Sequence, residues 1–249
     1  MDLQTYFINH NEIAVAFSGG VDSAYLLYAA AASGVRVKAF YVKTQFQPAF
    51  ELEDAAAIAR KVNSPLHVIN CDILAAEGVA ANGADRCYLC KRAIMGLVVK
   101  AADAEGFQLV ADGTNADDDA SDRPGMRAVA ELGIRSPLSE CGLTKARIRE
   151  LSREAGLFTW DKPSYSCLAT RIPAGSPITE DKLARTEAAE KYMVSIGFRN
   201  LRVRTIGDAA RIQIPSDMFA EAMKQRDNIR RELSKYYSGV LLDMEARDE

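Results

Sequence analysis

The stretch that most constrains this chain runs from Ala14 to Ser23, with the sequence AVAFSGGVDS. Four apolar residues predict a short buried strand, and the alanine- and leucine-rich run from Ala24 to Ala32 predicts a helix. The Ser-Gly-Gly turn between them lets backbone N–H groups approach a bound group closely, because glycine has no Cβ. The first N–H groups of a helix have no internal partner and mark the positive end of its dipole. A strand, a glycine turn and a helix N-terminus together predict an anion-binding loop.

This loop is not a Walker phosphate-binding sequence, because it lacks the lysine of that pattern. The candidates for binding the phosphates of a nucleotide are Ser18, Gly19, Gly20, Val21, Asp22 and Ser23. The Asp22 carboxylate cannot contact phosphate directly because like charges repel, so Mg²⁺ is the natural bridge between them. A helix-capping role is the alternative for this aspartate.

Strand-like and helix-like segments alternate along the first part of the chain. Strands are expected at 13–17, 35–42, 66–70 and 108–112, and helices at 23–33, 50–62 and 87–106. This alternation predicts an α/β fold in which helices cover both faces of a parallel sheet. Ligands of such folds bind beyond the carboxyl ends of the strands, where the glycine turn lies.

A second polar loop follows the strand expected at 108–112. Gly113, Thr114 and Asn115 are predicted to lie against the nucleotide, since short polar side chains at a strand end suit a ligand-facing loop. Asp117 and Asp118 come next, and they either hold the metal or only solvate the loop. The sequence does not decide between these two roles.

The remainder of the chain predicts a smaller α+β unit after an irregular stretch at 157–178. Thr144 and Thr179 are expected to cap helices, and Gly207-Asp208 predicts a hairpin turn. The expected elements are an extended piece at 134–138, helices at 144–155, 179–196 and 218–237, and strands at 201–206, 209–214 and 240–242. We therefore expect two domains, at residues 1–175 and 176–249.

Composition places the chain among ordinary globular proteins. It has 249 residues, a net charge of −3 and no apolar run approaching the ~18–20 residues that span a bilayer. This balance predicts neither a membrane nor a nucleic-acid partner, and an N-terminus without a signal-peptide pattern predicts a cytoplasmic location. Five cysteines, an odd number, argue against a disulfide framework, and two of them form a Cys-x-x-Cys pair that favours metal, cluster or redox chemistry.

Four further stretches accompany SGGVDS, and the set extends over nearly the whole chain. They are CYLCK at 87–91, ADGTNADD at 111–118, KPSYSCLATR at 162–171 and LRVR at 201–204. With the first loop, which is similar to the PP-loop of the ATP pyrophosphatase superfamily, they resemble the LarE family. The resemblance implies a PP-loop ATP pyrophosphatase domain followed by a small α+β domain.

LarE proteins are ATP-dependent sulfur transferases, and the resemblance implies the same activity here. Their substrate is pyridinium-3,5-dicarboxylate mononucleotide, a precursor of the nickel-pincer nucleotide cofactor of lactate racemase and related enzymes. Each carboxylate is adenylated with release of pyrophosphate and is then converted to a thiocarboxylate. The implied partners are this small nucleotide and further copies of the chain, because family members assemble as hexamers.

The three cysteines that resemble those holding a 4Fe–4S cluster in some LarE proteins are Cys87, Cys90 and Cys167. The resemblance implies a cluster in which one iron lacks a protein ligand and binds an extra sulfide. Other members surrender the sulfur of the single cysteine that matches Cys167. Zinc bound by the three thiols, and a redox pair without metal, are the remaining alternatives. Cys71 and Cys141 are expected to be packing or surface residues.

Arginines supply the candidates for binding the anionic substrate. Arg202 and Arg204 share one face of an expected strand, and two guanidinium forks suit a phosphate or a carboxylate. Arg171 lies just after Cys167 and is a similar candidate. Ordinary surface charge is the alternative for the pair on the strand.

Other activities use a similar nucleotide loop. Transfer RNA thiolation is disfavoured by the acidic balance and by the lack of a basic or zinc-ribbon RNA-binding segment. An amidotransfer-type synthetase, such as a GMP or NAD synthetase, would not need the cysteines. A protein that binds ATP without hydrolysing it is the non-enzymatic alternative, and pyrophosphate release distinguishes it.

Overall fold

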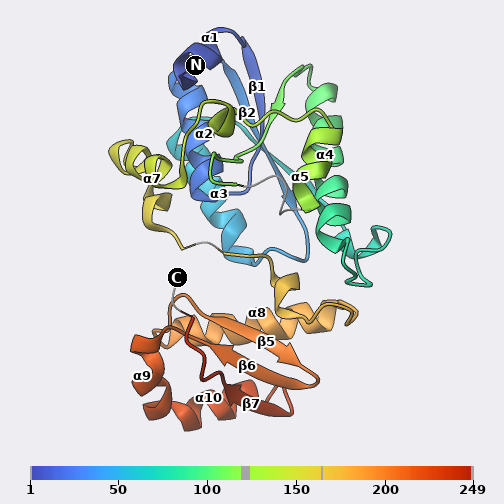
Figure 1. The fold of residues 1–249 in the computed structure, drawn as a ribbon, viewed down its shortest axis with the longest axis vertical. Coiled ribbons are helices and arrows are strands. Elements are labelled where there is room, and N and C mark those ends of the chain that lie inside the picture. The colour runs from blue at the N-terminus through green and yellow to red at the C-terminus, as the bar shows by residue number, and fades with distance from the viewer. Residues whose placement is uncertain (1, 119–123, 164, 248–249) are drawn as a thin grey trace. The chain divides into compact units, whose positions relative to one another are not determined.

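The chain divides into two compact units (Figure 1). Unit 1 comprises Met1–Val79 and Asp85–Ser164, and unit 2 comprises Ala80–Ala84 and Tyr165–Glu249. A domain boundary after residue 175 stays a prediction. The residues that the computed structural model describes are 2–118, 124–163 and 165–247.

A four-stranded parallel sheet forms the centre of unit 1, with the strand order β3-β2-β1-β4. Its strands are β1 (Glu12–Ala16), β2 (Arg36–Lys43), β3 (Leu66–Asn70) and β4 (Val110–Ala111). The prediction of an α/β fold with a parallel sheet is confirmed. Strand β4 is shorter than the predicted strand at 108–112. In the extended piece expected at 134–138, Arg135 forms an isolated parallel β-bridge with Ala111 of β4.

Helices cover both faces of this sheet (Figure 1). Alternate residues of β1 show this, because Val15 packs in one buried cluster with Leu26 of α2, whereas Ala14 packs in another with Val98 of α4. The helices of unit 1 are α1 (Leu3–Ile8), α2 (Val21–Ala32), α3 (Ala49–Lys61), α4 (Arg86–Ala104), α5 (Pro124–Glu131), α6 (Pro137–Glu140) and α7 (Lys145–Glu154), with short 3-10 turns at Ile73–Ala75 and Phe158–Asp161. None of the helices in the described residues has the length and apolar character needed to cross a membrane.

The strand order reverses direction at β1, because β2 and β3 lie on one side of it and β4 on the other. In open α/β sheets the crevice at such a reversal, beyond the carboxyl ends of the strands, is the usual ligand site. The two chain segments that leave β1 and β4 at this edge are the SGGVDS loop and the loop that begins at Gly113.

Unit 2 holds a three-stranded sheet with the order β5-β6-β7. Strands β5 (Arg202–Ile206) and β6 (Ala209–Gln213) pair antiparallel across the predicted turn, where Gly207 has a φ of 56°, and β7 (Gly239–Leu242) pairs parallel to β6. The remaining elements are α8 (Glu180–Ser195), α9 (Phe219–Lys224), α10 (Arg226–Leu233) and 3-10 turns at Leu168–Arg171 and Ser216–Met218. The prediction of one helix over 218–237 was wrong, because the helix breaks at Gln225.

A short excursion of the chain, Ala80–Ala84, belongs to unit 2. Asn82 is 2% exposed and has a φ of 56°, and its amide nitrogen donates hydrogen bonds to the carbonyl oxygens of Pro173 (2.8 Å) and Ser176 (3.0 Å). The backbone N–H of Gly175 donates to the carbonyl oxygen of Asn82 at 2.9 Å. One side chain therefore fixes the turn that precedes α8.

Candidate functional site

The SGGVDS loop has the strand–turn–helix geometry that the sequence predicts. Gly19 has a φ of 75°, a left-handed conformation that favours glycine, and Gly20 is the N-cap of α2. A Cβ at Gly19 would lie 3.2 Å from the Cβ of Ala55 on α3, so the turn also packs closely. The Oγ atoms of Ser18 and Ser23 lie 3.0 Å apart and close the loop with a hydrogen bond.

Asp22 lies in the first turn of α2, and its two carboxylate oxygens differ. Oδ2 accepts a hydrogen bond from Lys145 Nζ at 2.5 Å, whereas Oδ1 is buried without a hydrogen-bond partner in the described residues. A buried carboxylate oxygen without a partner is uncommon, and hard cations such as Mg²⁺ prefer oxygen ligands of this kind. The donor chemistry at Asp22 therefore fits a divalent cation.

The buried side chain of Asp112, which is 3% exposed, forms hydrogen bonds with the loop that follows β4. Its carboxylate accepts hydrogen bonds from the Thr114 backbone N–H (3.1 Å), from Thr114 Oγ1 (2.8 Å) and from Ser136 Oγ (2.8 Å). Lys91, in the CYLCK stretch on α4, places its Nζ 3.7 Å from Asp112 Oδ2. This loop is thereby linked to the helix that carries two of the cysteines.

The two predicted nucleotide loops meet at Gly113. A Cβ added there would lie 2.8 Å from the backbone nitrogen of Ser23 and 3.0 Å from its Cα. Glycine is required here because the loop after β4 passes directly against the N-terminus of α2. The structure thus brings the two predicted nucleotide loops together within unit 1, at Gly113 and Ser23.

Replacing Gly113 with alanine should displace the N-terminus of α2 and weaken ATP binding about tenfold, with a stability loss of ~1–3 kcal/mol from overpacking. Titration calorimetry with ATP and thermal unfolding measure the two effects. Gly96→Ala is the matched control, because a Cβ on this α4 glycine meets nothing within 4 Å and alanine favours helix. Equal ATP affinities in the two variants would contradict the close packing of the loops.

The aspartates that follow Asn115 have hydrogen-bonding roles inside unit 1. Asp117 Oδ2 accepts from the backbone N–H of Lys145 at 2.7 Å, at the start of α7, and Asp118 Oδ2 accepts from the Asn115 N–H at 3.1 Å. Asn115 Oδ1 in turn accepts from the Asp117 N–H at 2.9 Å. These contacts favour the structural role over metal binding for both carboxylates.

Cys87 and Cys90 lie one helical turn apart at the start of α4. Cys87 is exposed and accepts a hydrogen bond from Arg86 Nη2 at 3.4 Å, and Cys90 is half-buried. Tyr88 between them anchors the turn, because its hydroxyl donates to Glu131 at 2.6 Å. Within unit 1, the described residues gather no group of three or more metal-ligating side chains.

Cys167 lies in unit 2, in a loop that is held by a buried arginine. Arg171 is 1% exposed, and its Nε donates to Glu190 Oε1 at 2.7 Å. Its Nη1 donates to the carbonyl oxygen of Ser166 (2.9 Å) and to Thr170 Oγ1 (2.7 Å) on either side of Cys167. An enclosed guanidinium with these partners favours a role in shaping the Cys167 loop over the predicted contact with substrate. Ser164, in the same motif, lies outside the described residues.

Arg202 and Arg204 lie side by side on β5, as predicted from their spacing. Burial, reinforced by the positive charges of Arg171 and Arg247, lowers the pKa of Arg202 to about 10, and burial also lowers the pKa of Arg204. Arg204 donates to the carbonyl oxygen of Thr170 at 2.6 Å, beside the Cys167 loop. Arg202 is 4% exposed and its Nη1 donates to the carbonyl oxygen of Leu201 at 2.8 Å, whereas Arg204 is half-buried. A cluster of desolvated guanidinium groups favours binding of an anion, which would relieve their mutual repulsion.

The two other cysteines pack against the hydrophobic clusters of unit 1. Burial raises the pKa of the thiols of Cys71 and Cys141. A raised pKa lowers the fraction of thiolate, which is the reactive form and the metal ligand.

Comparison with known proteins identifies the family. The model of the queuosine biosynthesis protein QueC matches residues 12–92, a range that includes the SGGVDS loop, Cys87 and Cys90. A protein of Lactiplantibacillus plantarum named pyridinium-3,5-bisthiocarboxylic acid mononucleotide synthase is 31% identical over 235 residues, which cover 93% of this chain and 85% of the relative. The chain belongs to the LarE family.

Uncharacterized relatives also match along most of their length. One from Synechocystis sp. is 36% identical over 223 residues, covering 88% of this LarE-family chain and 82% of the relative. One from Methanocaldococcus jannaschii is 29% identical over 237 residues, covering 95% and 90%. These alignments extend through both units.

Sequence reasoning missed three residues of this LarE-family chain: Lys145 and Asp112, which contact the nucleotide loops of unit 1, and Glu190, which contacts Arg171 in unit 2. Lys145 is 123 positions from Asp22, and no local pattern marks it as a partner. The sequence predicts Glu190 only as part of a helix, but in the structure it forms an ion pair with Arg171, the arginine that holds the Cys167 loop. Asp112 stands in the ADGTNADD motif, but only the structure shows that it is buried beneath the loop.

Proposed function

We propose that this protein is an ATP-dependent sulfur transferase that acts on the carboxylates of pyridinium-3,5-dicarboxylate mononucleotide. The observation that carries the proposal is the buried Asp22 Oδ1 atom beside a glycine turn and a helix N-terminus, in a chain aligned with a synthase of the bisthiocarboxylic product. Backbone N–H groups of the turn would bind the leaving pyrophosphate. Mg²⁺ held by Asp22 would neutralise phosphate charge.

Activation has a direct chemical reason. A carboxylate is a poor electrophile, so its oxygen first attacks the α-phosphorus of ATP, which forms an acyl-adenylate and releases pyrophosphate. Sulfur then attacks the acyl carbon, and AMP leaves as the thiocarboxylate forms. The protein contributes positioning and charge stabilisation at phosphorus. Lys145 lies beside Asp22 and is placed to donate to phosphate oxygens when Mg²⁺ occupies the carboxylate.

For the sulfur source we propose Cys87, Cys90 and Cys167. Two soft thiol donors from one helical turn, one exposed and one half-buried, fit iron, and the Cys167 loop would supply the third thiol. A 4Fe–4S cluster held by the three would supply an iron that carries the transferable sulfide. The alternative is that Cys167 gives up its own sulfur.

Two measurements separate these sources. Anaerobically reconstituted protein should be brown and hold about four irons per chain if a cluster forms. Mass spectrometry after one turnover should then find Cys167 intact. Colourless, iron-free protein would exclude the cluster, and dehydroalanine at position 167 would identify the sacrificial route.

Changing Arg202 to alanine should raise KM for the mononucleotide about ten- to a hundredfold and leave ATP affinity unchanged, because a charge-assisted hydrogen bond contributes ~1.5–3 kcal/mol. Steady-state kinetics with each substrate varied in turn measures this. Arg199→Ala is the control, since Arg199 is an exposed arginine of the same unit that pairs with Asp217. An unchanged KM would remove Arg202 from the substrate site.

One incubation tests the proposed activity as a whole. The anaerobically reconstituted protein, supplied with sulfide, ATP, Mg²⁺ and the dicarboxylate mononucleotide, should yield AMP, pyrophosphate and a product in which sulfur replaces oxygen. Binding of ATP without release of pyrophosphate would instead indicate a non-enzymatic ATP-binding protein. Sulfur transfer to tRNA but not to the mononucleotide would indicate the thiolation of RNA. We further propose a homo-oligomer, a hexamer by family resemblance, which light scattering tests.

A further inference from the structure

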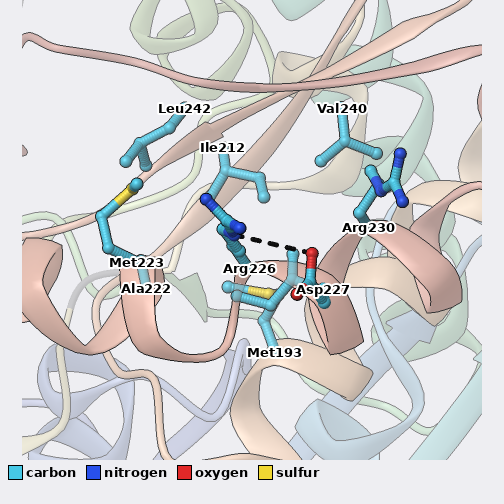
Figure 2. Close-up of a pocket in the computed structure, with 10 residues that line it drawn as sticks. Met193, Ile212, Ala222, Met223, Arg226, Asp227, Arg230, Val240 and Leu242 are labelled. Atoms are coloured by element: carbon cyan, nitrogen blue, oxygen red, sulfur yellow. Dashed lines mark ion pairs between the residues drawn. The ribbon is translucent and has the colours of Figure 1, made fainter.

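Unit 2 contains a cavity of about 450 Å³ that has no role in the proposed sulfur transfer (Figure 2). Helices α8, α9 and α10 and strands β6 and β7 each contribute to its wall. Its volume falls in the range of ~300–1,000 Å³ that is typical of small-molecule sites. The cavity therefore has the size of a binding site for a small ligand.

The floor of this cavity is apolar. Met193 and Ile212 are buried beneath it, and Figure 2 shows Met223 and Leu242 on one side and Val240 on the other. Methionine side chains are flexible and polarizable, so they adapt to ligands of irregular shape. Such a floor favours a hydrocarbon body and offers a sugar or a nucleotide base few polar partners.

The rim of the cavity carries two positive side chains and one negative side chain. Arg226 and Arg230 lie four positions apart on α10, so both face the same side of the helix. Arg226 pairs with Asp227 at 3.6 Å, as the dashed line in Figure 2 shows. Arg230 forms no ion pair within the part of the chain that the structure describes, so one positive charge at the rim is uncompensated.

We propose that this cavity binds a monoanion with an apolar body, of the chemical class of medium-chain carboxylates. The hydrocarbon chain would lie against Met193 and Met223, and the carboxylate would accept hydrogen bonds from the Arg230 guanidinium. Polyanions are disfavoured because Asp227 already neutralises the second arginine. The proposal does not rest on the sulfur-transfer function, since none of these residues belongs to the site described above.

The test uses the full-length protein labelled with ¹³C at its methionine methyl groups, of which the chain has seven. Decanoate should shift the Met193 and Met223 resonances in a saturable way and leave the others in place, with Met193→Leu and Met223→Leu supplying the assignments. Decan-1-ol, which has the same length without the charge, should bind about fivefold more weakly, as expected for loss of a partly exposed charge pair.

Charge reversal at the rim provides the decisive comparison. Arg230→Glu should weaken decanoate binding about tenfold or more, because it replaces an attraction with a repulsion. Arg231→Glu is the matched control on the same helix, where the exposed guanidinium bonds to Asn228 and does not line the cavity, and it should change affinity less than about twofold. Equal effects of the two variants, shifts spread over all methionines, or no binding at all would overturn the proposal.

Discussion

Changing Asp22 to asparagine is expected to slow pyrophosphate release about a hundredfold to a thousandfold. The substitution keeps the size of the side chain and removes the charge on the oxygen that has no partner in the described residues. Loss of one group that stabilises charge in a transition state has an effect of about this size. The rate should be measured with saturating ATP and substrate, and ATP binding should be measured with and without Mg²⁺.

Asp117→Asn provides the control for this experiment. Asp117 belongs to the same unit and carries the same charge, but its Oδ2 accepts a hydrogen bond from the Lys145 backbone N–H at the start of α7. Asparagine keeps an oxygen that can accept this hydrogen bond, so activity should stay within about twofold. A Mg²⁺ requirement that persists in Asp22→Asn, or equal losses in both variants, would assign the cation to other ligands.

Changing Cys167 to serine should reduce sulfur transfer by about a thousandfold or more, since residues that act directly in chemistry have effects of that order. Adenylation should continue, and it can be followed as substrate-dependent exchange of labelled pyrophosphate into ATP. The loop should survive, because Thr170 and Arg171 hold it through the backbone carbonyl of Cys167. The variant thereby separates activation of the carboxylate from delivery of sulfur.

Cys141→Ser is the matched substitution away from the site. Cys141 packs against the core of unit 1, so serine there should lower stability by ~1–3 kcal/mol and leave sulfur transfer intact. If Cys167→Ser transfers sulfur as fast as Cys141→Ser, neither a cluster ligand nor a sacrificial donor is needed at position 167. If it also stops pyrophosphate exchange, the residue has a role in activation that the proposal does not include.

The parts of the fold that the sequence predicts well are governed by local interactions. Gly19 needs a left-handed backbone, which glycine adopts without strain, and Thr144 and Thr179 accept hydrogen bonds from the N–H groups of Arg147 and Lys182, as predicted for N-caps. Each of these features involves residues within one turn. The parallel sheet of unit 1 is likewise predicted, from the alternation of apolar strands and helices.

The parts that sequence reasoning misses depend on distant contacts. The helix break at Gln225 has no glycine or proline to mark it, and tertiary contacts such as that of Gln225 Nε2 with the Ile196 carbonyl oxygen (3.4 Å) cannot be read from a local pattern. Arg171 forms an ion pair with Glu190 of α8, a contact between distant positions that no local pattern indicates. Lys145 is an ordinary helix residue until the fold places it beside Asp22.

The five residues Ala80–Ala84 determine which fragments of this protein can fold as separate domains, because they belong to unit 2. A gene fragment that starts at Tyr165 omits Asn82, and the carbonyl oxygens of Pro173 and Ser176 then lose their amide donor. Residues 165–249 alone are therefore an incomplete domain and are not suited to fusion with another protein. A working transplant would have to carry a peptide equivalent to residues 80–84, supplied either in trans or through a rearranged chain order.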